Sequence, residues 1–63
     1  MIPIRVMICD DEPLARSYLR GLIESEPECE LVAECKDVDE AIAAIESLSP
    51  DLVFLDIQMP GQS

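Results

Sequence analysis

The sequence predicts an open α/β fold, a doubly wound parallel sheet. Two observations support this prediction. Segments with the apolar pattern of a strand alternate with segments that have the pattern of a helix, in the order strand, helix, strand, helix, strand. The last strand segment is apolar without any alternation, which is typical of a central parallel strand covered on both faces. Together these observations exclude a helical bundle and an all-β sandwich.

The first strand and the first helix have clear signals. Residues 4–10 are mostly apolar with a period of two, which a strand requires, and the strand is expected to end at Asp10. A helix is predicted over about residues 13–25, because Pro13 has no N–H to lose in a first turn. Apolar pairs recur every four residues along this helix: Leu14/Ala15, Tyr18/Leu19 and Leu22/Ile23.

A second strand and a second helix follow. Residues 31–35 are predicted as a short strand, and Glu34 within it indicates an edge position where one side chain reaches water. Asp37 stands where the N-cap of a helix belongs, and Glu40 completes an acidic version of the capping box. The apolar face of this helix consists of Val38, Ala41, Ile42, Ile45 and Leu48.

The third strand is predicted over residues 52–55, after Ser-Pro-Asp at residues 49–51 ends the second helix. With the second strand at the edge and the apolar third strand central, the expected sheet order is 2-1-3. The direction of winding then reverses between the first and third strands, and ligands of such sheets bind at that reversal, outside the carboxyl ends of the strands.

Composition restricts the partners of this segment. The 63 residues carry 4 Lys+Arg against 14 Asp+Glu, a net charge of −10, so the surface repels phosphate backbones and anionic membranes. We therefore expect no direct binding of nucleic acid and no membrane association. The amino terminus resembles neither a secretory nor an organellar leader, which favours a cytoplasmic location.

The three cysteines carry no metal or disulfide signature. The sequence has an odd number of cysteines, no CxxC pair and no histidine; the cysteines are Cys9, Cys29 and Cys35. We interpret them as small apolar thiols that are buried or half-buried.

Three aspartates are predicted to meet at one edge of the sheet. Asp10 and Asp11 follow the first strand, and Asp56 follows the third. Clustered carboxylates repel one another, so such a site normally holds a hard cation, and Mg²⁺ is the natural occupant because it leaves positions for phosphoryl oxygens. The alternative is that acidic residues merely end strands and cap helices, which explains one aspartate better than three.

Two runs of sequence resemble a known family. The runs are Asp-Asp-Glu-Pro-Leu-Ala-Arg at residues 10–16 and Pro-Asp-Leu-Val-Phe-Leu-Asp-Ile-Gln-Met-Pro-Gly at residues 50–61. Together they resemble the receiver domain of bacterial two-component response regulators, which has a CheY-like, flavodoxin-like fold. The first run is similar to receivers that precede a LytTR-type DNA-binding domain.

The resemblance implies roles for four residues. Asp56 would accept a phosphoryl group from a sensor histidine kinase. Asp10, Asp11 and Asp56 would hold Mg²⁺, with Asp10 acting through water, and Gln58 would add a backbone carbonyl. The domain would thus be a phosphoacceptor that takes part in its own phosphoryl transfer and not an enzyme. Met-Pro-Gly at residues 59–61 would form the turn beside the site.

The resemblance covers part of a receiver domain. A full receiver continues for two more strands and three more helices, which supply a switch Ser or Thr and a Lys. Lys36 cannot replace that Lys, because it follows the predicted edge strand. Residues 1–63 are therefore interpreted as the amino-terminal portion of a receiver, with its carboxyl-terminal part and any effector domain absent. Dimerisation or DNA binding would belong to the full-length protein.

Two other functions remain as alternatives. One is a pseudo-receiver that acts only as an interaction module, independently of phosphorylation. The other is an aspartyl-phosphate phosphatase of the haloacid-dehalogenase type, which also places an aspartate after an apolar parallel strand. That family usually has a second aspartate two residues after the nucleophile, and this sequence has Gln58 there.

Overall fold

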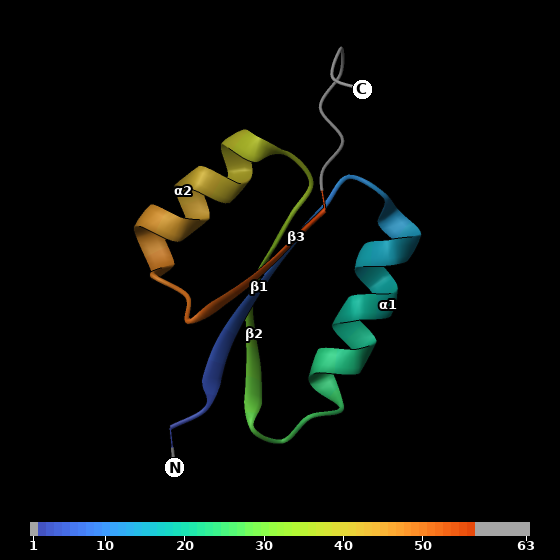
Figure 1. Cartoon of the computed structure of the whole chain (residues 1–63), viewed down its shortest axis with the longest axis vertical. Helices are drawn as coiled ribbons and strands as arrows, with labels where there is room; N and C mark the ends of the chain where they lie inside the picture. The colour runs from blue at the N-terminus through green and yellow to red at the C-terminus, as the bar shows by residue number, and fades with distance from the viewer. Residues whose placement is uncertain (1, 57–63) are drawn as a thin grey trace.

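The computed structural model describes residues 2–56 as three parallel strands and two helices (Figure 1). The elements are β1 (Ile4–Asp10), α1 (Pro13–Glu24), β2 (Cys29–Cys35), α2 (Val38–Leu48) and β3 (Leu52–Asp56). The sheet order is β2-β1-β3, and β1 pairs in parallel with both neighbours. The predicted element order and sheet order are therefore confirmed.

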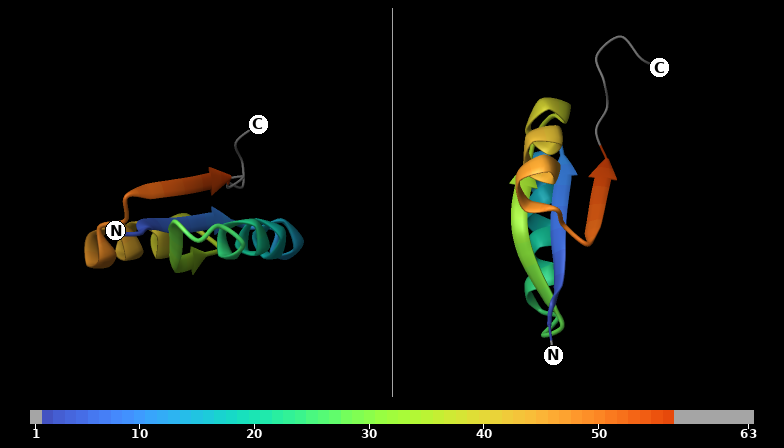
Figure 2. Two further views of the ribbon diagram at one scale, coloured as in Figure 1. Left: turned by 90° about the horizontal axis from the view of Figure 1, so that it is seen from below. Right: turned by 90° about the vertical axis from the view of Figure 1, so that its left-hand side faces the viewer.

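Strand β1 forms the centre of the structure. Its residues from Val6 to Cys9 have no exposed surface, and Asp10 is 3% exposed. The two helices lie on opposite faces of the sheet, over β1 and β2, so both faces of β1 are covered (Figure 2). On one face Met7 and Cys9 pack with residues of β2 and α2, and on the other Val6 and Ile8 pack with Ile23 of α1.

Helix α1 buries a narrower face than its apolar pattern indicates. Ile23 is buried and Leu19 packs against the core, but Leu14 and Tyr18 are 79% and 69% exposed. Neighbouring residues of a helix point about 100° apart, so one member of each apolar pair faces the sheet and the other faces water. The prediction that these pairs form a single buried face is wrong for their first members.

Helix α2 has the predicted cap at its amino end and an unpredicted one at its carboxyl end. The Asp37 carboxylate accepts a hydrogen bond of 2.8 Å from the Glu40 N–H, and the Glu40 carboxylate accepts one of 2.9 Å from the Lys36 N–H. At the other end, Ser49 has a left-handed backbone with φ of 47°. Arg5 donates from Nη1 to the Leu48 carbonyl over 2.6 Å, which places a cation at the negative end of the helix dipole.

Strand β3 differs most from its prediction. Its apolar run predicts a central strand covered on both faces, yet within residues 2–56 it pairs only with β1 and lies at the edge of the sheet. Phe54 and Leu55 are 42% and 65% exposed. The reason is geometric, because α1 and α2 pack over β1 and β2 and extend little over β3 (Figure 2). The predicted covering of both faces of the third strand is wrong for residues 2–56, whereas its unpaired edge is the one expected for the amino-terminal portion of a receiver.

The cysteines behave as apolar thiols, as predicted. All three are free, Cys9 and Cys35 are buried, and Cys29 is half-buried. Cys9 and Cys35 are register partners on β1 and β2. Burial, followed by a hydrogen bond with Cys35, raises the pKa of the Cys9 thiol from 9.0 to about 12. Cys9 therefore carries no charge at neutral pH.

Candidate functional site

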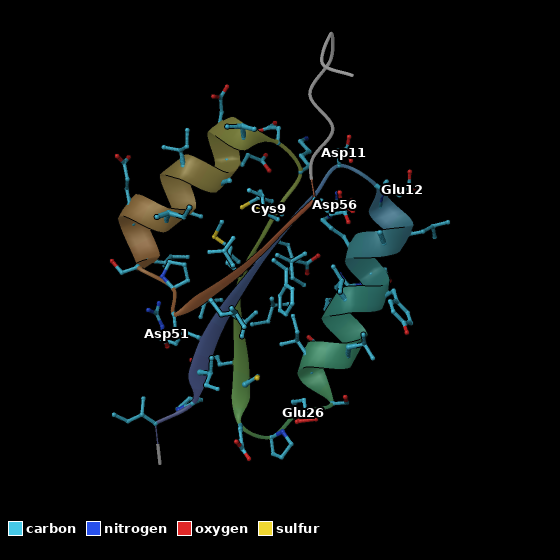
Figure 3. All side chains as sticks on the ribbon, viewed as in Figure 1. Cys9, Asp11, Glu12, Glu26, Asp51 and Asp56 are labelled. Atoms are coloured by element: carbon cyan, nitrogen blue, oxygen red, sulfur yellow. The ribbon has the colours of Figure 1, made fainter. Side chains whose placement is uncertain are left out.

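The candidate site lies where β1 and β3 end side by side. Asp10 closes β1, Asp56 closes β3, and the two are register partners across the parallel pair. Figure 3 shows Asp11 and Glu12 at the same end of the sheet, on the connection from β1 to α1. The predicted meeting of the strand ends follows from the observed topology, since parallel strands finish at the same edge.

One pocket gathers the acidic residues of this edge. It has a volume of about 370 Å³ and is lined by Asp10, Asp11, Glu12, Ala15 and Asp56. Four of the five lining residues carry carboxylates. Within residues 2–56, Arg and Lys side chains form no ion pair with these four, and the ion pairs that do form are directed to Glu34. The pocket therefore concentrates negative charge and favours a cation.

The connection from β1 to α1 is fixed by two hydrogen bonds at Asp10. The Asp10 side chain accepts from the Glu12 N–H over 2.9 Å, which forms a local turn two residues long. The Asp10 carbonyl accepts from Nη1 of Arg16 over 2.8 Å. Asp10 is thus a buried carboxylate with a defined orientation, whereas Asp11 beside it is exposed to solvent.

The donor set suits a hard cation with an incomplete protein shell. Carboxylate oxygens are the ligands that Mg²⁺ accepts, and Mg²⁺ usually retains several waters. Among residues 2–56, no three His, Cys, Asp or Glu side chains come close enough together to hold a metal ion by themselves. The three aspartates therefore share one pocket without forming a closed cage. A cation there would complete its shell with water and with ligands from elsewhere.

Some predicted site residues lie outside the described range, and two residues at the site were not predicted from the sequence. Gln58 and the turn predicted at residues 59–61 fall beyond the described residues. Glu12, which lines the pocket, and Arg16, which binds the Asp10 carbonyl, were not predicted as site residues. The spacing places Arg16 one helical turn after Glu12, near the start of the helix, which indicates proximity to this site but not the hydrogen bond to Asp10.

Neither of the helices in the described range has the length and apolarity needed to cross a bilayer.

Comparison with known proteins gives consistent matches. The family model for the response regulator receiver domain matches residues 6–63. The transcriptional regulatory protein BtsR of Salmonella typhi is 54% identical over 57 residues, which cover 90% of this chain and 24% of the relative. The protein-glutamate methylesterase/protein-glutamine glutaminase 2 of Carboxydothermus hydrogenoformans is 45% identical over 60 residues, 95% of this chain and 17% of the relative.

A solved structure agrees in fold. The crystal structure of the response regulator domain of Thermotoga maritima CheB superposes with a TM-score of 0.87 at 36% identity. The superposition covers 97% of this chain and 46% of the solved chain. The chain therefore spans less than half of the solved domain and a still smaller share of the curated relatives.

Proposed function

The chain belongs to the family of response regulator receiver domains of two-component systems. We propose that Asp56 accepts a phosphoryl group from a sensor histidine kinase. One observation carries the proposal. Asp56 ends β3 beside Asp10 at the end of β1, on a pocket lined by acidic residues. A phosphoacceptor needs a carboxylate at the surface and a cation next to it; Asp56 is an exposed carboxylate, and the acidic pocket beside it supports a cation there.

We propose that the cofactor is Mg²⁺. Asp10, Asp11 and Asp56 would hold it, together with the backbone carbonyl of Gln58, which lies outside the described residues. When bound, Mg²⁺ supplies the positive charge that lets an anionic carboxylate approach an anionic phosphoryl group. The fixed turn at Asp10 keeps one carboxylate in place, and the exposed Asp11 is free to ligate directly.

The chemistry that we propose for this chain is a single transfer. A carboxylate oxygen of Asp56 forms a bond to phosphorus as the bond from phosphorus to the donor breaks, and no water is consumed in that step. The domain would thus act as a phosphoacceptor. Relatives named as protein-glutamate methylesterases carry an enzymatic activity in their names, and whether the full-length protein is an enzyme depends on regions beyond residues 1–63.

The output of the full-length protein is also part of the proposal. We propose that residues 1–63 are the amino-terminal portion of a receiver, because they cover 46% of the solved CheB domain. The relatives named transcriptional regulatory proteins favour control of transcription through a further domain, of LytTR type as the wording of residues 10–16 suggests. Such a protein would work in the cytoplasm, and both DNA binding and dimerisation would belong to its other regions.

A substitution experiment tests the phosphoacceptor. The full-length protein is incubated with acetyl phosphate or a phosphorylated kinase in the presence of Mg²⁺, and incorporated phosphoryl groups are counted for three forms. Asp56→Asn is expected to abolish labelling. Asp51→Asn, at the opposite end of β3, is a matched control and is expected to label as the parent does. Labelling that persists in Asp56→Asn would reject the proposal, and the pseudo-receiver alternative predicts no labelling of the parent.

A further inference from the structure

Arg16 bridges the acidic pocket to the far edge of the sheet. Its Nη1 donates to the Asp10 carbonyl over 2.8 Å, and its Nε lies 3.9 Å from Oε1 of Glu34. Arg16 belongs to α1, Asp10 to the end of β1, and Glu34 to β2. The Arg16 side chain therefore contacts both the end of β1, which lines the pocket, and the neighbouring strand β2, which does not line it.

Glu34 is held in a suitable place to orient Arg16. It also accepts from Nη1 of Arg20, with distances of 3.1 and 3.4 Å to its two oxygens. The side chains of Glu34 and Arg16 are 27% and 22% exposed, compared with 43% for Arg20. The Arg16 guanidinium thus lies on the more enclosed side of Glu34, where solvent screens its interactions least.

The backbone that Arg16 contacts is the one that positions the aspartates. Asp10 accepts two hydrogen bonds, one at its side chain from the Glu12 N–H and one at its carbonyl from Arg16. Glu12 is the N-cap residue of α1, and its own side chain makes no capping hydrogen bond. The contact from Arg16 therefore ties the start of the helix to the end of the strand across the turn that contains Asp11.

We propose that Arg16 is a positioning residue for the acidic pocket, and that Glu34 holds it in the orientation that fixes the turn of Asp10 and Asp11. The inference rests on the proposed function in one respect, since it takes Mg²⁺ as the cation of that pocket. A hydrogen bond from a charged donor is among the stronger ones in a protein, so its loss frees the turn.

Electrostatics alone predicts the opposite effect on cation binding. Arg16 carries a positive charge and binds the backbone of Asp10, which lines the pocket, so its removal makes the surroundings of the pocket more negative. If Arg16 acted only through its charge, Mg²⁺ would bind more tightly to Arg16→Met. If Arg16 positions the turn, Mg²⁺ binds more weakly, by roughly tenfold for a lost charge-assisted hydrogen bond. The sign of the change separates the two roles.

The experiment is a Mg²⁺ titration of the full-length protein, followed by the backbone amide signals of Asp11 and Glu12. Arg16→Met is expected to raise the dissociation constant about tenfold. Arg20→Met is the matched control, because it removes the same charge from the same helix and the same partner but has no contact with Asp10. It is expected to change the constant by less than about twofold.

A double-mutant cycle tests the role of Glu34. Glu34→Gln alone is expected to weaken Mg²⁺ binding a few-fold. Because Glu34 is proposed to act through Arg16, the same substitution is expected to have no further effect once Arg16 is methionine. Arg16→Lys keeps the positive charge and the fold of α1 but loses the guanidinium, which can donate to two partners at once. Its affinity for Mg²⁺ is expected to lie between those of the parent and Arg16→Met. Equal effects of Glu34→Gln in both backgrounds would overturn the assignment to Glu34.

Failure of the inference can be told from failure of the proposed function. If the parent binds Mg²⁺ and Arg16→Met binds it equally or more tightly, positioning by Arg16 is rejected and the proposed function stands. If the parent binds no Mg²⁺, the proposed cofactor is rejected, and amide hydrogen exchange decides the inference. Faster exchange of the Glu12 amide in Arg16→Met than in Arg20→Met supports it, and equal exchange overturns it.

Discussion

Strands β1 and β3 resemble each other in sequence and differ in their surroundings. Both are apolar, both end in an aspartate, and both deliver that aspartate to the same pocket. Residues 6–9 of β1 have no exposed surface, whereas Leu55 of β3 is 65% exposed. The difference comes from position, because β1 is paired on both sides and lies under both helices. An apolar pattern therefore identifies strands that can be buried, and the packing of the helices determines which of these strands are buried.

The largest effect that separates the two strands is on stability. Ile8→Ala removes a fully buried side chain of β1 and is expected to lower the free energy of unfolding by about 2–5 kcal/mol. Leu55→Ala removes a side chain of β3 that is mostly exposed and is expected to cost under ~1 kcal/mol in the 63-residue chain. Urea unfolding of both variants measures the difference.

The same pair of substitutions also shows whether β3 is exposed in the full-length protein. If Leu55→Ala is as costly as Ile8→Ala in the full-length protein, other regions of that protein cover β3, and its exposure belongs to residues 2–56 alone. If Leu55→Ala is as costly in the 63-residue chain itself, the account of β3 as an exposed edge is wrong.

A second effect depends on pH and concerns β1. Burial raises the pKa of Cys9 from 9.0 to about 12, so the folded state holds this proton more tightly than the unfolded state does. The resulting contribution to stability is complete below pH 9.0 and is lost as the pH rises from 9.0 to about 12. Urea unfolding at several alkaline pH values is expected to show this decline.

Two variants control for other titrating groups. Cys9→Ala is expected to flatten the decline, because it removes the buried thiol that binds the proton. Cys29→Ala, at a half-buried thiol on β2, is expected to leave the decline in place. A decline that is equally steep in Cys9→Ala would show that another group is responsible.

The smallest effect concerns the exposed edge of β3. Unpaired edge strands with apolar side chains promote association between chains, and a charged residue on such an edge reduces it. Leu55→Lys is expected to change the free energy of unfolding by about 0.5 kcal/mol or less while it lowers the tendency of the 63-residue chain to self-associate. Light scattering at increasing concentration measures the second effect. If self-association is unchanged, the chains associate through another apolar surface, for example Leu14 and Tyr18 of α1.

Much of the fold follows from local sequence signals. Pro13 marks the start of α1 and Asp37 caps α2, and Glu34 in the second strand with the apolar run of the third predicts the sheet order. The exposure of Leu14 could not be predicted, because periodicity shows an apolar face without showing how wide a surface it packs against. The unpaired edge of β3, in contrast, follows from the interpretation of residues 1–63 as the amino-terminal portion of a receiver. The Arg5 cap on α2 was also missed, since it joins residues 43 positions apart in the sequence.

The candidate site could likewise be predicted only in part. The proximity of Asp10 and Asp56 could be predicted, because parallel strands that neighbour one another end at one edge. The contact between Arg16 and the Asp10 carbonyl could not, because it depends on a side-chain rotamer and on a partner in another strand, Glu34. Residue type and spacing place a group near a site, and packing decides which atom it contacts.

We propose that the ends of β1 and β3 form one site with Asp56 as its phosphoacceptor. Site-resolved mapping of the aspartyl phosphate on the full-length protein tests it most directly. After incubation with acetyl phosphate, borohydride reduces the acyl phosphate to homoserine, and peptide mass spectrometry locates it. We expect homoserine at position 56 alone when Mg²⁺ is present, and none after chelation. Modification at another carboxylate, or labelling that does not depend on Mg²⁺, would contradict it.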